Sequence, residues 1–147
     1  MEYELCEYLG FGNITEKTYR DWQEHYGVDW VKEMDAEHEL KMAADFGQTM
    51  ITDFPEMTSP FWNMSRNDGG GTSKKIDVIL GGMETIGSAE RSCDVDMMRD
   101  TFHTITEGAY SNLLFELFGK DRVEAELEEF LKFDFFPRVG GGIRSTD

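Results

Sequence analysis

The sequence predicts an α+β domain in which an antiparallel β-sheet is flanked by helices. Short apolar runs separated by turn residues fill the middle of the 147-residue chain, a pattern typical of β-hairpins. After Asp94 the apolar residues recur at helical spacing instead. A run of strands followed by a run of helices favours this class over the doubly wound α/β class, in which the two alternate.

Two helices are expected before the first strand. The first spans residues 15–26 and ends at Gly27, since glycine commonly terminates a helix. The second begins after Asp35, which can cap its first turn, and ends at Gly47. Its helical spacing places these residues on one face: Leu40, Ala43 and Ala44.

Four strands are predicted, in residues 50–54, 61–65, 75–80 and 83–91. A Pro-rich turn separates the first two. The last two are joined by Gly81-Gly82, a dipeptide that favours a tight hairpin turn. The glycine-rich segment 67–73 is interpreted as a hairpin loop rather than a domain linker.

Two amphipathic helices separated by Gly119 are expected in the last third of the chain. We predict that their apolar faces pack on the sheet. The apolar positions of the two helices are Tyr110, Leu113, Leu114 and Leu117, and then Val123, Leu127, Phe130 and Leu131.

Composition predicts one soluble domain, with 39% hydrophobic and 13% aromatic residues. No apolar run is long enough to cross a membrane and no basic signal-peptide region is seen, so a cytoplasmic location is expected. Cys6 and Cys93 are interpreted as reduced thiols, and the scattered histidines do not suggest a metal site. A net charge of −16 argues against the chain holding nucleic acid by itself, because phosphates would be repelled.

The predicted hairpin over residues 76–91 carries the most informative spacing of charged residues. If Ile79 pairs with Glu84, then Asp77 pairs with Ile86, and Asp77 and Glu84 become diagonal neighbours on one face. Two adjacent carboxylates repel unless a cation lies between them. Oxygen ligands at this spacing suit Mg²⁺, which proteins hold with one or two carboxylates plus substrate phosphates.

Arg91 follows Glu84 by seven residues, which would place it on the opposite face of a regular strand. A β-bulge at Gly87-Ser88 would return Arg91 to the carboxylate face. Its guanidinium could then grip a ligand carboxylate with two hydrogen bonds. The alternative is an ordinary surface salt bridge from Arg91 to Glu84 or Asp77.

The C-terminal run 136–147 contains a glycine triplet, Gly140-Gly141-Gly142. Consecutive glycines permit close approach of a ligand to the backbone, but they are equally compatible with an ordinary loop.

Together these segments resemble the catalytic domain of class II aminoacyl-tRNA synthetases of the Asp/Asn/Lys subclass, and above all archaeal asparagine synthetases related to asparaginyl-tRNA synthetase. The similarity spans residues 35–143 and rests on segments 53–64, 84–92 and 133–137. The resemblance implies that residues 1–147 form the C-terminal portion of one such domain. Residues 1–34 would be a helical lead-in, and residues 35–147 would hold the metal and amino-acid site and the start of motif 3.

The resemblance also implies a role for each candidate residue. Asp77 and Glu84 would hold magnesium on ATP, Ser88 would lie beside the metal, and Arg91 would bind the side-chain carboxylate or amide of aspartate or asparagine. Gly140, Gly141 and Gly142 would begin motif 3 beside the adenine. The family reaction forms an aminoacyl-adenylate, from which the acyl group passes to tRNA or, in the asparagine synthetases, to ammonia.

Departures from the family pattern predict that the chain is incomplete and inactive alone. Arg144 stands where motif 3 has a small residue and Asp147 where it has an adenine-stacking arginine, and no motif 1 or motif 2 is found. The expected ligands are ATP and aspartate or asparagine, with tRNA contacted only through missing regions and no membrane partner. An incomplete sheet would expose an edge, so a homodimer or a separate N-terminal half is expected. The alternative is a non-catalytic synthetase paralogue that acts as a binding or interaction subunit.

Overall fold

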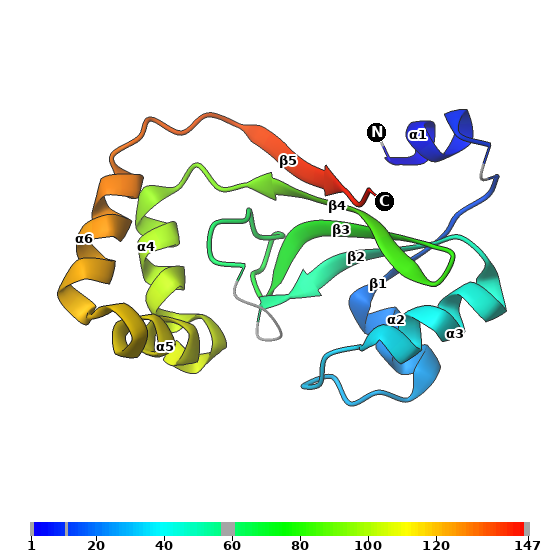
Figure 1. Cartoon of the computed structure of the whole chain (residues 1–147), viewed down its shortest axis with the longest axis horizontal. Coiled ribbons are helices and arrows are strands. Elements are labelled where there is room, and N and C mark those ends of the chain that lie inside the picture. Colours follow the sequence, from blue (N-terminus) through cyan, green and yellow to red (C-terminus); the bar gives the residue numbers. More distant parts are fainter. Residues whose placement is uncertain (1, 11, 57–60, 146–147) are drawn as a thin grey trace.

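The computed structural model describes residues 2–10, 12–56 and 61–145. A five-stranded mixed sheet with the order β1-β2-β3-β4-β5 forms its centre (Figure 1). The strands are β1 (Thr15–Thr18), β2 (Thr49–Pro55), β3 (Thr72–Leu80), β4 (Met83–Arg91) and β5 (Arg138–Ile143). The helices are α1 (Glu2–Tyr8), α2 (Tyr19–Tyr26), α3 (Ala36–Phe46), α4 (Val95–Thr104), the 3-10 turn η2 (Ile105–Gly108), α5 (Ala109–Phe118) and α6 (Lys120–Leu131).

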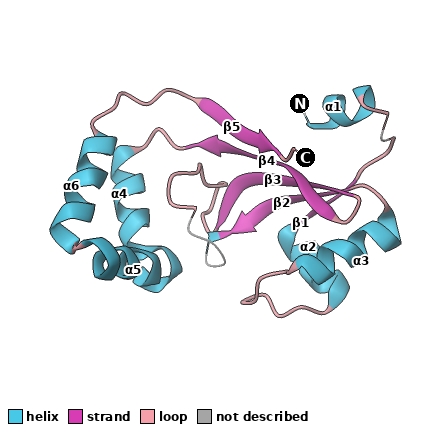
Figure 2. Cartoon of the chain, viewed as in Figure 1, coloured by secondary structure: helices cyan, strands magenta, loops and turns pink. Residues whose placement is uncertain are grey.

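Helices cover parts of both faces of the sheet (Figure 2). On one face, α2 and α3 pack against β2 and β3 around the fully buried Trp22 and Met42. On the other face, Cys6 of α1 packs against Met50, Val78 and Ile86. None of the helices in the described part of the chain is long and apolar enough to span a membrane.

The N-terminal segment departs from the prediction, because the expected helix over residues 15–26 begins only at Tyr19. Residues 15–18 instead form β1, which pairs in parallel with β2. Thr18 ends the strand and caps the helix, since its hydroxyl accepts a hydrogen bond from the Asp21 N–H at 3.1 Å. The expectation that two helices precede the first strand was therefore wrong, and it also missed α1.

Helix α3 has the predicted ends but a different buried face. Asp35 caps it in a reciprocal arrangement with His38, and Gly47 follows its last residue. Met42 faces the sheet and is fully buried, whereas Leu40, which was predicted to lie on the apolar face of the helix, is 59% exposed. Apolar residues crowd this short helix on several sides, so its periodicity alone did not identify the inner face.

We expect Met42→Ala to lower the free energy of unfolding by about 2–5 kcal/mol, because it leaves a cavity in the core between α3 and the sheet. Leu40→Ala is the matched control in the same helix and should cost less than about 1 kcal/mol. Urea denaturation followed by circular dichroism measures both. A larger loss for Leu40→Ala would contradict the observed orientation of α3.

The predicted strand over residues 61–65 is not formed. Two isolated bridges join this region to the sheet, from Met64 to Arg91 and from Arg66 to Ser73. The loop that follows is short, because the Asn67 N–H donates to the Thr72 carbonyl at 2.9 Å and β3 begins there. Residues 57–60 of the predicted Pro-rich turn lie outside the described part of the chain.

The helices after Asp94 form a cluster of their own instead of packing on the sheet as predicted. Buried residues of α4 and α6 pack together with Trp62, and the α4–α6 group lies beyond one end of the sheet (Figure 1). Leu113 and Leu117 of α5, expected on the inner face, are 54% and 63% exposed. The aromatic residues of α4, α5 and α6 supply apolar partners for one another, so the sheet is not needed to bury them.

Candidate functional site

The hairpin formed by β3 and β4 positions the candidate carboxylates. Both turn glycines have positive φ, 62° at Gly81 and 79° at Gly82, as the predicted tight turn requires. Ile79 lies opposite Glu84 as expected. Asp77, however, lies opposite Gly87 rather than Ile86, so the predicted register is shifted by one residue beyond that point.

The shift comes from a β-bulge at Thr85, the extra residue of β4 between the Ile79–Glu84 and Val78–Ile86 pairs. The predicted bulge at Gly87-Ser88 was therefore two residues too late. Its consequence is the same, because one inserted residue between Glu84 and Arg91 brings both to one face of the sheet. Asp77 shares that face, since it lies opposite Gly87.

Gly87 leaves a gap between the two carboxylates. A Cβ atom at this position would lie 2.6 Å from Glu84 Oε1 and 3.3 Å from Asp77 Oδ1. Both oxygens therefore border one small space that any larger residue would fill. Hard oxygen ligands around such a space fit Mg²⁺ shared with a phosphate ligand. Within the described residues there is no cluster of three or more His, Cys, Asp or Glu side chains suited to a metal, so any cation here would need further ligands.

Asp77 is a buried carboxylate with an internal partner. Burial raises the pKa of Asp77, whereas the Lys75 ammonium acts in the opposite direction. Lys75 Nζ lies 2.5 Å from Asp77 Oδ1. The nearby charge of Glu84 also acts to raise the pKa of Asp77. No sequence motif singles out Lys75.

Arg91 lies over the adjoining strand β5. A Cβ atom at Gly140 would be 3.0 Å from Arg91 Nε, so the missing side chain makes room for the guanidinium. Gly142 lies opposite Gly87 and shares its face, with no atom within 4 Å of a Cβ placed there. The structure thus brings Asp77, Glu84, Arg91, Gly140 and Gly142 to one face of the sheet.

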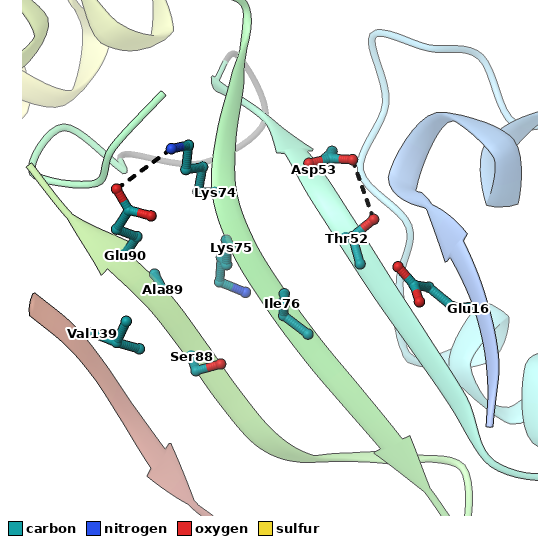
Figure 3. A pocket seen from close by; sticks show the side chains of 10 residues that line it. All are labelled: Glu16, Thr52, Asp53, Lys74, Lys75, Ile76, Ser88, Ala89, Glu90 and Val139. Carbon is teal, nitrogen blue, oxygen red and sulfur yellow. Dashed lines mark hydrogen bonds and ion pairs between the residues drawn. The ribbon is translucent and has the colours of Figure 1, made fainter. Parts of the chain in front are cut away.

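Ser88 and Gly141 point to the opposite face. Ser88 lies opposite Ile76 and Gly141, and a Cβ at Gly141 would be 2.9 Å from that of Ser88. Figure 3 shows Ser88 of β4 next to Ile76 of β3, with Thr52 of β2 beyond it. These residues line a hollow of 480 Å³ on that side. The predicted place of Ser88 beside the carboxylates is corrected here, because the bulge lies at Thr85 and strand alternation resumes before Ser88.

Glu39 of α3 is a further carboxylate at the site that sequence reasoning missed. It lines a hollow of 690 Å³ together with Glu84, Gly87, Gly142 and Arg144. Burial raises the pKa of Glu39, while Arg144 acts to lower it. No spacing rule connects a helix residue near position 39 with a hairpin some forty-five residues later, so only the packing of α3 on β4 reveals it.

Comparison with known proteins decides the family. Residues 11–142 match the family of tRNA synthetases class II (D, K and N). The chain belongs to this family. The synthetase resemblance read from segments 53–64, 84–92 and 133–137 is thereby confirmed, and the particular resemblance to asparagine synthetases stays a prediction.

Among curated proteins, an asparagine--tRNA ligase of Rhodopirellula baltica is 34% identical over 76 residues, which cover 50% of this chain and 15% of the relative. An aspartyl tRNA synthetase from Entamoeba histolytica superposes with a TM-score of 0.65 and 19% identity, over 90% of this chain and 27% of that one. Asparaginyl-tRNA synthetase of the same organism, in complex with asparaginyl-adenylate, superposes with a TM-score of 0.65 and 16% identity, over 90% of this chain and 30% of that one. These structures show that the five-stranded sheet with its helices is the class II synthetase fold. The chain spans less than a third of the length of each of these relatives.

Proposed function

We propose that the face of the hairpin bearing Asp77, Glu84 and Arg91 binds ATP-associated magnesium and the amino acid of an adenylate-forming ligase that acts on aspartate or asparagine. The observation that supports this most is the gap at Gly87, bordered by one oxygen of each carboxylate. Family membership and the resemblance of segment 84–92 point to the same chemistry. One structural neighbour holds asparaginyl-adenylate, the product expected of such a reaction.

Each residue contributes to positioning and electrostatics rather than to covalent chemistry. Asp77 and Glu84 would supply ligand oxygens, and magnesium bound there would offset phosphate charge during attack by the amino-acid carboxylate. Arg91 would hold the polar end of the amino-acid side chain through two parallel hydrogen bonds. Arg91 covers Gly140, whereas the space over Gly142 is open, so a nucleotide could approach the backbone of β5 closely at Gly142.

The acceptor of the acyl group is proposed to be either tRNA or ammonia. The net charge of −16 favours ammonia, because an acidic surface repels an RNA backbone. Contacts made by another polypeptide segment would reverse this preference. Location in the cytoplasm, where amino-acid activation takes place, belongs to the same proposal.

We expect Arg91→Met to weaken binding of aspartate or asparagine at least about tenfold, since the loss of a charge-assisted pair costs more than about 1.4 kcal/mol. Binding of Mn²⁺-ATP should remain within about twofold of the wild-type chain. Isothermal titration calorimetry measures both. Failure of the unaltered chain to bind either ligand at millimolar concentration would overturn the proposed function.

Pyrophosphate exchange with ATP and aspartate should give no signal for the 147-residue chain alone. We propose this because the adenine-stacking arginine of motif 3 is replaced by Asp147, which lies outside the described residues. A robust exchange rate would contradict this prediction.

The second candidate function is a non-catalytic binding subunit. It is favoured by Arg144, which stands where the resemblance implies a small residue in motif 3 and whose positive charge acts on Glu39. It predicts that neither ATP nor the amino acid binds.

A further inference from the structure

We infer that Lys75 is a built-in counter-cation of the carboxylate site, which weakens the binding of a free divalent cation and makes metal binding depend on a phosphate-bearing ligand. The inference rests on the proposed function and adds a regulatory property to the same site. It concerns a residue that no sequence motif singled out, and it follows from which oxygen of Asp77 is already occupied.

One oxygen atom takes part in both arrangements. Asp77 Oδ1 faces the gap at Gly87 that Glu84 Oε1 also borders, and the same atom receives the Lys75 ammonium at 2.5 Å. A divalent cation that bridged the two carboxylates would share this oxygen with a fixed positive charge. Like charges so close repel strongly where water is largely excluded, and the Lys75 and Asp77 side chains are only 14% and 10% exposed.

Lys75 cannot easily withdraw to make room. Its ammonium lies 3.8 Å from the centroid of the Phe54 ring and 5.1 Å from that of Phe61. Aromatic faces attract a desolvated cation, so the two rings and Asp77 together hold the ammonium in place. A flexible surface lysine would move away when a metal bound, whereas the Lys75 ammonium is held in place beside the site.

A bound nucleotide would reduce the repulsion between Lys75 and a divalent cation. Its phosphates bring several negative oxygens to the gap, which supply further ligands for the metal and offset the charge of Lys75. The chain would therefore bind Mg²⁺ poorly alone and well together with ATP. Glu39 borders the same hollow as Glu84, but among the described residues no three such side chains are grouped to hold a metal by themselves.

We expect Lys75→Met to bind Mn²⁺ alone roughly tenfold more tightly than the wild-type chain, because the repelling charge is gone and methionine still packs on the rings. Electron paramagnetic resonance of Mn²⁺ titrated into the 147-residue chain measures this. Lys74→Met is the matched control, because Lys74 is the neighbouring lysine on the opposite face and pairs with Glu90 at 3.5 Å. It should leave the affinity unchanged.

Two further variants test the cause. Lys75→Arg keeps the positive charge and should bind Mn²⁺ as weakly as the wild type. Adding Asp77→Asn to Lys75→Met should cancel the higher Mn²⁺ affinity that Lys75→Met alone provides. Equal affinities of Lys75→Met and Lys74→Met would overturn the inference. If Lys75→Met does not fold, the acetylation rates of the two lysines in the unaltered chain test the inference instead. Lys75 should react at least tenfold more slowly than the half-exposed Lys74. Equal rates would refute the fixed position of Lys75.

The two proposals fail in different ways. If Mn²⁺-ATP and the amino acid bind but Lys75→Met gains nothing, the inference about Lys75 is wrong and the proposed function stands. If Lys75→Met gains affinity for Mn²⁺ while neither ATP nor the amino acid binds any variant, Lys75 is a counter-cation of a site that serves another ligand.

Discussion

Gly87→Ala should weaken binding of Mn²⁺-ATP by about 10–100-fold, the loss typical when the groups that orient a metal ligand are disturbed. The added methyl group would stand 2.6 Å from Glu84 Oε1 and 3.3 Å from Asp77 Oδ1. Glu84 is exposed, so its carboxylate has room to move away and the sheet is not strained. The space between the two carboxylates would then be filled by carbon.

Stability separates this effect from damage to the fold. Gly87 has no positive φ, so alanine fits its backbone, and the free energy of unfolding should stay within about 1 kcal/mol or rise slightly. Gly142→Ala is the control: it lies opposite Gly87 on the same face with open space around its Cβ position. The added methyl group narrows the approach of a nucleotide to β5 but leaves the space between the two carboxylates open, so this variant should weaken Mn²⁺-ATP binding clearly less than Gly87→Ala does. Equal losses in both variants would show that the gap at Gly87 is not the binding site.

The hairpin was predictable because local rules determine it. Gly81-Gly82 specifies a tight turn, and the turn fixes the first pair, Ile79 with Glu84, whatever surrounds it. The convergence of Asp77 and Glu84 followed from that pair and survived the error in register. The position of the bulge was not predictable, because threonine is a common strand residue and Thr85 carries no sequence signal for a bulge.

The features that the sequence did not reveal depend on tertiary contacts. Lys75 belongs to no sequence motif, and its enclosure depends on contacts with Phe54 and Phe61. Glu39 reaches the site because α3 turns Met42 inward, which no periodicity in an eleven-residue helix could settle. In each case the deciding partner is distant in the sequence, so local pattern could not supply it.

Trp22→Ala should lower the free energy of unfolding by about 3–5 kcal/mol, which is a large part of the stability of a small domain. Trp22 is fully buried, its ring stacks on Tyr26 and meets Phe46 edge-on, and its Nε1–H donates to the Met50 carbonyl at 3.1 Å. The substitution would remove this apolar surface and leave a buried carbonyl without that donor. Chemical denaturation followed by circular dichroism measures the loss.

Trp30→Ala provides the matched control, because this tryptophan is 58% exposed and its carbonyl, which accepts from Gln23 Nε2 at 3.4 Å, survives the substitution. It should change stability by less than about 0.5 kcal/mol. A similar loss in both variants would contradict the placement of α2 against β2. Because β2 is the neighbour of β3 in the sheet, loosening α2 should also weaken Mn²⁺-ATP binding at Asp77, although Trp22 touches no ligand. Coupled losses of stability and binding in Trp22→Ala, with neither in Trp30→Ala, would show that the helix layer keeps the carboxylate site in register.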